Sequence, residues 1–171
     1  NLTVTLKTAL SNATKQLEAI QGIDAFVEAD ILLSHVLEKP RSWLFAWPEH
    51  NLTQNNLDRF HSLIQRRIQG EPISYITNNR EFYSLELKVS THTLIPRHET
   101  ELLVDTALEL LPLPDASVLE LGTGSGAITV ALASQKPGWR FLVTDIQDST
   151  LEVARYNFEK FQVNAETLIS N

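Results

Sequence analysis

The chain has 171 residues, which is enough for one full domain or two small ones. With 43% hydrophobic and 20% charged residues, it has the composition of an ordinary soluble globular protein. A formal net charge of −7 argues against a broad electrostatic grip on nucleic acid, whereas a basic protein partner is compatible with it. Cysteine is absent, which excludes disulfide bonds, thiolate catalysis and metal sites with cysteine ligands.

No apolar run reaches the length of a membrane span and no signal peptide opens the sequence, so we expect no membrane partner and a cytoplasmic location. Methionine is also absent, an initiator included. We therefore expect the sequence to be part of a longer chain.

Residues 1–72 are predicted to form a small helical bundle. Leu6, Leu10, Leu17 and Ile20 give the first helix an apolar face. The second is predicted to start at Asp24 and to turn these residues inward: Phe26, Val27, Ile31, Leu32, Leu33, Val36 and Leu37. A short helical turn follows, whose aromatic side chains are expected to fill the core rather than to form an exposed patch: Trp43, Phe45 and Trp47.

A third long helix is predicted from Thr53, its N-cap, to Gly70 and Pro72, which are typical of a helix end. Near that end, Arg66 and Arg67 are expected to lie on a solvated helix face rather than on an acidic partner.

Residues 73–95 change period and are predicted to form a β-hairpin that connects two domains, with strands at 81–84 and 86–90. From residue 96 to 171, helices alternate with strands, which favours an α/β fold with a parallel, doubly wound sheet. The predicted elements are a helix at 98–111, a strand at 117–121, a helix at 126–135, a strand at 140–144, a helix at 149–161 and a strand at 167–169.

The strand at 117–121 runs directly into a glycine-rich loop, Glu120-Leu121-Gly122-Thr123-Gly124-Ser125-Gly126. Glycine permits positive φ and leaves no Cβ between the backbone and a ligand, and the following helix offers free N–H groups. The spacing differs from the G-x-G-x-x-G of dinucleotide sites. It resembles the S-adenosylmethionine loop of Rossmann-like methyltransferases, in which an acid such as Glu120 faces the charged methionine end of the cofactor.

A second acid, Asp145, ends the next predicted strand. The carboxyl ends of adjacent parallel strands face one crevice, so Asp145 is expected to accept hydrogen bonds from a ribose, with Ile146 beside it in the same site. The alternative is that Asp145 or Asp148 caps the next helix, a role for which Asp148 or Ser149 is better placed.

Four sequence blocks together resemble the release factor glutamine methyltransferases of the HemK/PrmC type. In chain order they are R-R-I-Q-G-E-P-I (66–73), R-E-F-Y (80–83), L-I-P-R-H-E-T-E (94–101) and E-L-G-T-G-S-G-A-I (120–128). The glycine loop indicates only a methyltransferase, whereas the second and third blocks single out this family. The resemblance covers nearly the whole chain.

This resemblance implies transfer of a methyl group from S-adenosylmethionine to the amide nitrogen of the glutamine in the Gly-Gly-Gln motif of peptide chain release factors, with S-adenosylhomocysteine as product. It places Gly122, Thr123, Gly124, Ser125 and Gly126 along the cofactor, Glu120 near its amino group, Asp145 at the ribose, and Arg97 and Thr100 beside the crevice. His98 stands where the family usually has proline.

The family holds its substrate amide with an Asn-Pro-Pro-Tyr motif, which this sequence lacks and which we expect beyond Asn171. We therefore assign no catalytic residue within the chain. No metal site is expected, because none of the five histidines forms an H-x-x-x-H or H-E-x-x-H pair. A monomer is expected. Two rival functions remain: an adenine amino-methyltransferase acting on DNA or RNA, and a non-catalytic binding module.

Overall fold

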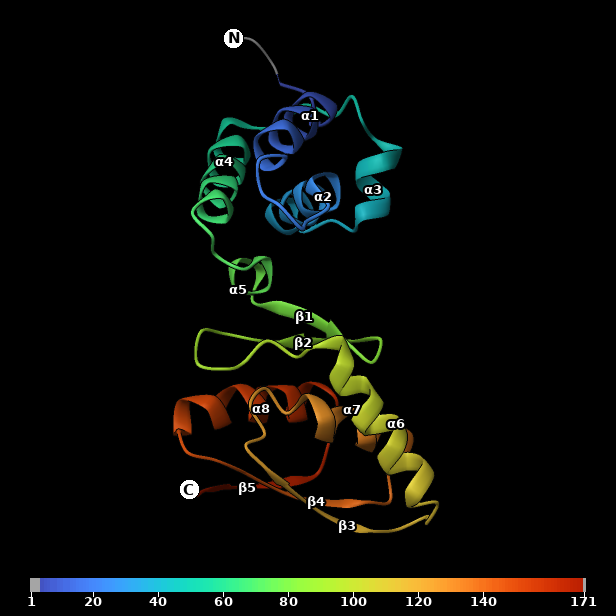
Figure 1. Cartoon of the computed structure of the whole chain (residues 1–171). Coiled ribbons are helices and arrows are strands. Elements are labelled where there is room, and N and C mark those ends of the chain that lie inside the picture. Colours follow the sequence, from blue (N-terminus) through green and yellow to red (C-terminus); the bar gives the residue numbers. More distant parts are fainter. Residues whose placement is uncertain (1–3, 171) are drawn as a thin grey trace. The chain divides into compact units, whose positions relative to one another are not determined.

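A computed structural model describes residues 4–170 of the chain, so residues 1–3 and 171, at the ends of the two expected domains, lie outside it. The chain divides into two compact units, Asn1–Thr77 and Asn78–Asn171 (Figure 1). Each unit has its own hydrophobic core.

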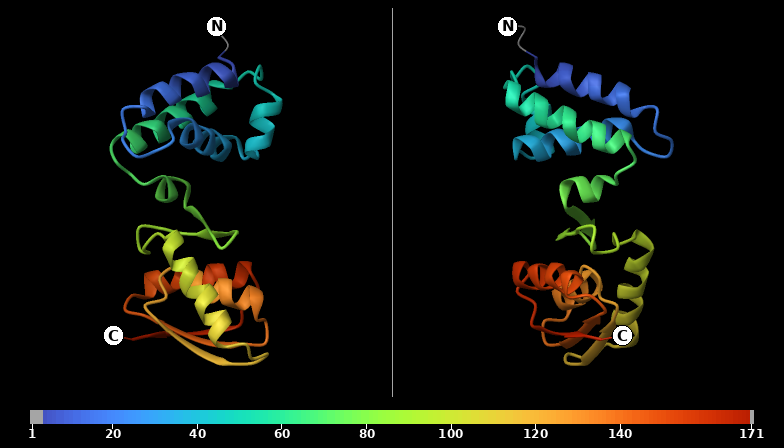
Figure 2. Two further views of the ribbon diagram at one scale, coloured as in Figure 1. Left: turned by 45° about the vertical axis from the view of Figure 1, so that its right-hand side comes forward. Right: turned by 90° about the vertical axis from the view of Figure 1, so that its left-hand side faces the viewer.

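The first unit is helical, as the sequence predicts. Its helices are α1 (Leu6–Leu17), α2 (Ala25–Leu37), α3 (Arg41–Ala46), α4 (Gln54–Ile68) and α5 (Ile73–Thr77). Figure 2 shows α1, α2 and α4 packed side by side. The predicted caps are confirmed, because the side chains of Asp24 and Thr53 accept hydrogen bonds from the first turns of α2 and α4.

The core of this unit consists of leucines and other apolar side chains from α1, α2 and α4. Ile20 lies beyond the end of α1 but still packs against it. The prediction was wrong for three aromatic side chains, Phe26, Phe45 and Trp47, whose exposed fractions are 46%, 55% and 59%. For Phe45 and Trp47, the reason is that α3 is so short that it buries only Leu44, which leaves its other sides in water. Phe26, in α2, lies beside the exposed Phe45, with the two ring centres 6.2 Å apart.

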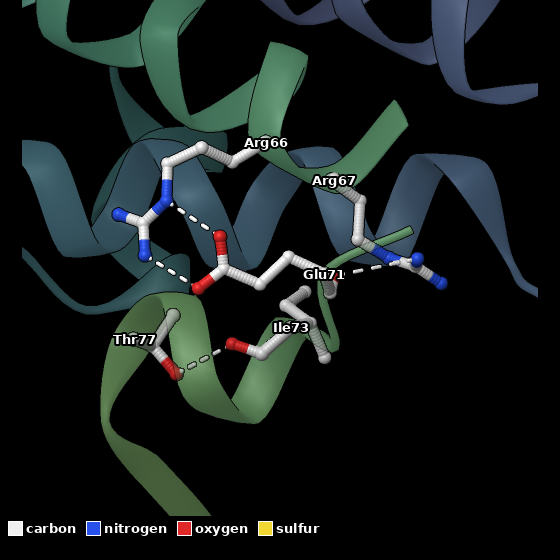
Figure 3. A network of polar contacts seen from close by, with 5 residues as sticks. All are labelled: Arg66, Arg67, Glu71, Ile73 and Thr77. Carbon is white, nitrogen blue, oxygen red and sulfur yellow. Dashed lines mark hydrogen bonds and ion pairs between the residues drawn. The ribbon is translucent and has the colours of Figure 1, made fainter. Parts of the chain in front are cut away.

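The C-terminal end of α4 is fixed by backbone and side-chain contacts (Figure 3). Gly70 has φ +96, and the N–H groups of Gly70 and Glu71 donate to carbonyls of the last helical turn. Arg66 makes two hydrogen bonds to the Glu71 carboxylate, at 2.7 and 2.6 Å. Arg67 pairs with Glu28 of α2 at 2.6 Å. The expected solvated face is therefore wrong for Arg67, which joins α4 to α2.

The segment expected to be a hairpin from residue 73 begins instead with helix α5. Its first turn forms on Pro72, whose carbonyl accepts from the N–H groups of Tyr75 and Ile76. The hairpin itself is β1 (Asn79–Phe82) paired with β2 (Leu85–Lys88). Tyr83 and Ser84, which were predicted to end the first strand, form its two-residue turn with φ of 52° and 59°.

The second unit contains a parallel three-stranded sheet, which confirms the predicted α/β class. After the hairpin come η1 (His98–Thr100), α6 (Glu101–Leu110), β3 (Ser117–Leu121), α7 (Ala127–Gln135), β4 (Arg140–Asp145), α8 (Asp148–Lys160) and β5 (Ala165–Ile169). The sheet order is β3-β4-β5. The helix expected at 98–111 begins with the 3₁₀ turn η1 rather than as an α-helix.

The two faces of this sheet differ. Helices α7 and α8 lie on one side of it (Figures 1 and 2), over the buried side chains of Phe141 and Val143. On the opposite side, four leucines are exposed by between 37% and 74%: Leu119, Leu121, Leu142 and Leu168. Thr144, which pairs with Leu121 and Leu168 on this side, is buried. Within residues 4–170, no helix combines the length and apolar character required to cross a lipid bilayer.

Candidate cofactor site

The loop between β3 and α7 depends on glycine at three alternate positions. Gly122, Gly124 and Gly126 have φ of 70°, 58° and 80°, a region that other L-residues rarely adopt. A Cβ on Gly126 would lie 2.7 Å from the ring of Phe158, so glycine is required there for space as well. At Gly122 and Gly124 a Cβ would meet no atom within 4 Å, so the backbone there is open to a ligand.

Hydrogen bonds tie this loop to the end of the neighbouring strand. The Thr123 N–H donates to the Thr144 carbonyl at 2.9 Å, and the Gly126 N–H donates back to Thr123 at 2.9 Å. The Gly124 N–H donates to the carboxylate of Asp145 at 3.0 Å. The loop and Asp145 are therefore brought together, as the sequence predicts for the carboxyl ends of adjacent strands.

Asp145 does not cap helix α8. The N-cap of α8 is Gln147, whose side chain makes no capping hydrogen bond, so the predicted cap at Asp148 or Ser149 is wrong. Asp148 lies inside the helix and pairs with Arg155 at 2.9 Å. The other carboxylate oxygen of Asp145 accepts from the N–H of Ile146 at 2.8 Å, and each oxygen keeps a lone pair for a further donor. Ile146 is exposed.

Glu120 points to the helix side of the sheet beneath the loop. Its carboxylate accepts a hydrogen bond of 2.5 Å from the hydroxyl of Thr129 in α7. Burial raises the pKa of the Glu120 carboxyl, the hydrogen bond from Thr129 counteracts this, and the negative charge of Asp145 adds to the rise. A cation close to Glu120 and Asp145 would lower the pKa of Glu120 instead, because an opposite charge favours the ionised carboxylate.

Arg97 and Thr100 lie before helix α6. Arg97 is exposed at the N-terminus of η1, and the backbone N–H of Thr100 donates to the Arg97 carbonyl. In the described part of the chain, no hydrogen bond or ion pair joins either side chain to the glycine loop. His98, at the position of the family's proline, has its Nδ1 3.5 Å from the carboxylate of Glu101.

Sequence reasoning missed three residues that contact the loop or Glu120: Thr129, Asn157 and Phe158. The sequence does contain a signal for two of them, because Thr129 is a polar residue in a largely apolar helix and Asn157 falls on the apolar face of α8, beside Val153, Ala154 and Phe158. Asn157 is wholly buried. A buried polar side chain needs hydrogen-bond partners, and both find theirs at this site.

Between residues 4 and 170, no group of three or more His, Asp or Glu side chains is arranged to hold a metal ion.

Comparison with known proteins agrees with this architecture. Residues 8–77 match the family model described as the PrmC N-terminal domain, and residues 98–171 match that described as the methyltransferase small domain. Among solved structures, coclaurine N-methyltransferase bound to N-methylheliamine and SAH aligns with 98% of this chain and 50% of its own, at 22% identity and a TM-score of 0.42, a likeness too low to bear on function.

Three similar proteins are named release factor glutamine methyltransferase. That of Aliivibrio fischeri is 46% identical over 157 residues, which are 91% of this chain and 55% of the relative. That of Vibrio cholerae is 44% identical over 95% of this chain and 57% of its own length. That of Escherichia coli is 40% identical over 90% of this chain and 55% of its own length. The chain thus spans little more than half the length of these relatives, and it belongs to the release factor glutamine methyltransferase family.

Proposed function

We propose that this chain binds S-adenosylmethionine at the glycine loop and contributes the cofactor half of an enzyme that methylates a glutamine side chain. The substrate we propose is the glutamine of the Gly-Gly-Gln motif in peptide chain release factors. Family membership supports the reaction class. The observation that carries the proposal is the convergence of three positive-φ glycines with Glu120 and Asp145 at the ends of two adjacent strands.

Each site residue has a role that its chemistry supports. The Glu120 carboxylate would pair with the ammonium group of the cofactor. The loop glycines let the backbone approach the methionine part of the cofactor closely. Asp145 keeps free lone pairs for two ribose hydroxyls. Ile146, exposed beside it, offers an apolar contact. Thr123 and Ser125 are buried and shape the loop from below. Arg97 and Thr100 are assigned to the crevice by family resemblance.

The reaction requires alignment more than acid–base strength, because the lone pair of an amide nitrogen is delocalised into its carbonyl. When bound, S-adenosylmethionine supplies a methyl group on a positively charged sulfur. In methyl transfer to an amide nitrogen, the N–C bond would form as the C–S bond breaks, S-adenosylhomocysteine would leave as a neutral thioether, and the amide proton would pass to water. The residues of this chain contribute by fixing the position of the donor, so that orientation provides the acceleration.

Cofactor binding by this chain can be measured by isothermal titration calorimetry with S-adenosylhomocysteine. We expect Asp145→Ala and Glu120→Gln each to weaken binding about tenfold or more, which corresponds to about 1.4 kcal/mol or more. Glu152→Ala, on the exposed side of α8, is the control and should bind like the unaltered chain. Unchanged affinity in Asp145→Ala would overturn the site assignment. Absence of binding by the unaltered chain would favour a non-catalytic module.

Methyl transfer is tested with a longer chain that includes the expected Asn-Pro-Pro-Tyr motif. We expect label from tritiated cofactor to enter a release factor and to be lost when the glutamine of Gly-Gly-Gln is replaced. Label in DNA or RNA instead would favour the adenine amino-methyltransferase.

The same proposal includes a monomer that acts in the cytoplasm without a membrane or nucleic-acid partner. Sedimentation equilibrium tests the oligomeric state.

A further inference from the structure

Asn157, near the C-terminal end of α8, makes three hydrogen bonds from a buried position beside the glycine loop. Its exposed fraction is 0%. Its carbonyl oxygen accepts from the N–H of Lys88 at 2.8 Å, and its amide nitrogen donates to the Lys88 carbonyl at 2.9 Å and to the Ser125 carbonyl at 2.8 Å. Both N–H donors of the amide are therefore used, on two different segments.

The first segment is the hairpin. Lys88 ends β2, and the Asn157 amide bonds both its N–H and its carbonyl, as a neighbouring strand would. Two further contacts join α8 to β2. The ammonium group of Lys160 donates to the Glu86 carbonyl at 2.6 Å, and the ammonium group of Lys88 lies 4.1 Å from the ring centre of Tyr156. The C-terminal part of α8, from Tyr156 to Lys160, is therefore attached to β2.

The second segment is the glycine loop. Ser125 stands between Gly124 and Gly126, and the peptide unit that carries its carbonyl also carries the N–H of Gly126. Fixing this carbonyl therefore fixes the orientation of that peptide plane. The ring of Phe158, the next residue of α8, fills the space where Gly126 would carry a Cβ. Consecutive residues of α8 thus hold consecutive residues of the loop.

We propose that Asn157 is a positioning residue for the cofactor loop, which orients the Ser125–Gly126 peptide unit and joins it to hairpin strand β2. This inference takes the identity of the ligand from the proposed function. The hydrogen bonds of Asn157 do not depend on that function. The hairpin then belongs to the support of the cofactor site and is not only a connector. An amide is required because no other side chain of this size offers two donors and an acceptor.

The test compares Asn157→Ala with Thr150→Val in the 171-residue chain. Thr150 is a matched control: it is buried in the same helix and donates to a backbone carbonyl, that of His92, which lies outside the loop. Thr150→Val loses one hydrogen bond to the backbone, outside the loop, whereas Asn157→Ala loses three, one of them to the loop. Asn157→Ser, which keeps a hydroxyl and leaves room for water, replaces Asn157→Ala if the latter does not fold.

Two readouts are taken under conditions where urea unfolding shows each variant to be folded. In amide hydrogen exchange, we expect Asn157→Ala to lose at least tenfold protection at residues 123–126, relative to Thr150→Val. In calorimetry with S-adenosylhomocysteine, we expect at least fivefold weaker binding for Asn157→Ala and less than twofold change for Thr150→Val.

Equal loop protection in the two variants would overturn the positioning role, and so would equal affinity in both. If the unaltered chain binds no S-adenosylhomocysteine, the proposed function fails, while hydrogen exchange still decides the role of Asn157. The two failures are therefore distinguishable.

Discussion

At the scale of single residues, the three loop glycines are required for different reasons. All three have positive φ, but only Gly126 also faces a side chain, the ring of Phe158, at the place where a Cβ would stand. Gly122 faces open space. Replacing each of these two glycines by alanine therefore separates the cost of backbone strain from the cost of steric overlap.

We expect Gly122→Ala to lower the free energy of unfolding by about 1 kcal/mol, from strain at positive φ alone. Gly126→Ala adds overpacking against Phe158 and should cost about 2–4 kcal/mol. Urea denaturation of both variants measures the difference. Equal losses would show that Phe158 moves aside without cost. Gly126→Ala combined with Phe158→Leu is a check, since it relieves the overlap and leaves the strain.

Two glutamates should give opposite dependences of stability on pH. Burial raises the pKa of Glu120, so its folded-state carboxyl prefers the proton, and its contribution is lost as pH rises above the unfolded value. Hydrogen bonds from Arg66 lower the pKa of Glu71, so its contribution is present above the unfolded value and is lost as pH falls through the lowered one.

Unfolding by urea between pH 3 and 7 compares Glu120→Gln and Glu71→Gln with the unaltered chain. Relative to that chain, we expect Glu120→Gln to gain stability as pH rises through and above about 4.5, the ordinary value. Glu71→Gln should lose relative stability as pH rises toward that value, and more weakly at high salt because the pair is partly exposed. If the free energy of unfolding relative to the unaltered chain changed with pH in the same direction for both variants, the opposite pKa shifts of Glu120 and Glu71 would be contradicted.

At the scale of elements, the hairpin turn conflicts with its sequence. Tyr83 and Ser84 both adopt positive φ, where two-residue turns prefer asparagine and glycine. The turn persists because Tyr83 is anchored: its N–H donates to Glu101 at 2.8 Å and its hydroxyl donates to Asp105 at 2.8 Å. Tertiary contacts with α6 thus override local preference.

Ser84→Gly should therefore stabilise the protein by about 0.5 kcal/mol, because relief of strain exceeds the added flexibility of the unfolded chain. The melting temperature should rise. Tyr83→Gly is the matched variant and should lower it, since it relieves the same strain but removes the hydroxyl bond to Asp105. A fall in Ser84→Gly would contradict this account.

The same turn illustrates what sequence can and cannot predict here. The alternation of strands and helices, the caps at Asp24 and Thr53 and the meeting of the loop with Asp145 follow from local patterns, and they were predicted. Tyr83 was assigned to a strand, because aromatic residues favour strands and its anchors lie 18 and 22 residues away. Asn157 was missed likewise, because its partners lie 32 and 69 residues away.

At the scale of the molecule, each of the two units has its own core. Buried residues of the first core run from Leu6 to Ile76 and those of the second from Phe82 to Phe158. A fragment of residues 1–77 should therefore fold by itself, with a helical circular dichroism spectrum and a cooperative thermal transition. Leu32→Ala in the fragment should lower the midpoint, because Leu32 is fully buried. A non-cooperative melt would contradict independent folding.

The four exposed leucines of the sheet, Leu119, Leu121, Leu142 and Leu168, form an apolar surface on the second unit. We expect it to bind the dye 8-anilinonaphthalene-1-sulfonate in the native chain. Leu119→Thr with Leu168→Thr should reduce the fluorescence by at least half, because threonine suits strands but removes apolar surface. Leu94→Thr is the control, as Leu94 is also exposed but lies outside the sheet. Equal reductions would contradict this assignment.

The bonds that form the cofactor site also differ in how much chain they enclose. Gly124 and Asp145 are 21 positions apart, and Ser125 and Asn157 are 32 apart, whereas Asn157 and Lys88 are 69 apart. The entropic cost of closing a loop rises with its length. During folding, the loop, β4 and α8 should therefore assemble first, and the hairpin should join them last and be the first to leave when the domain begins to open.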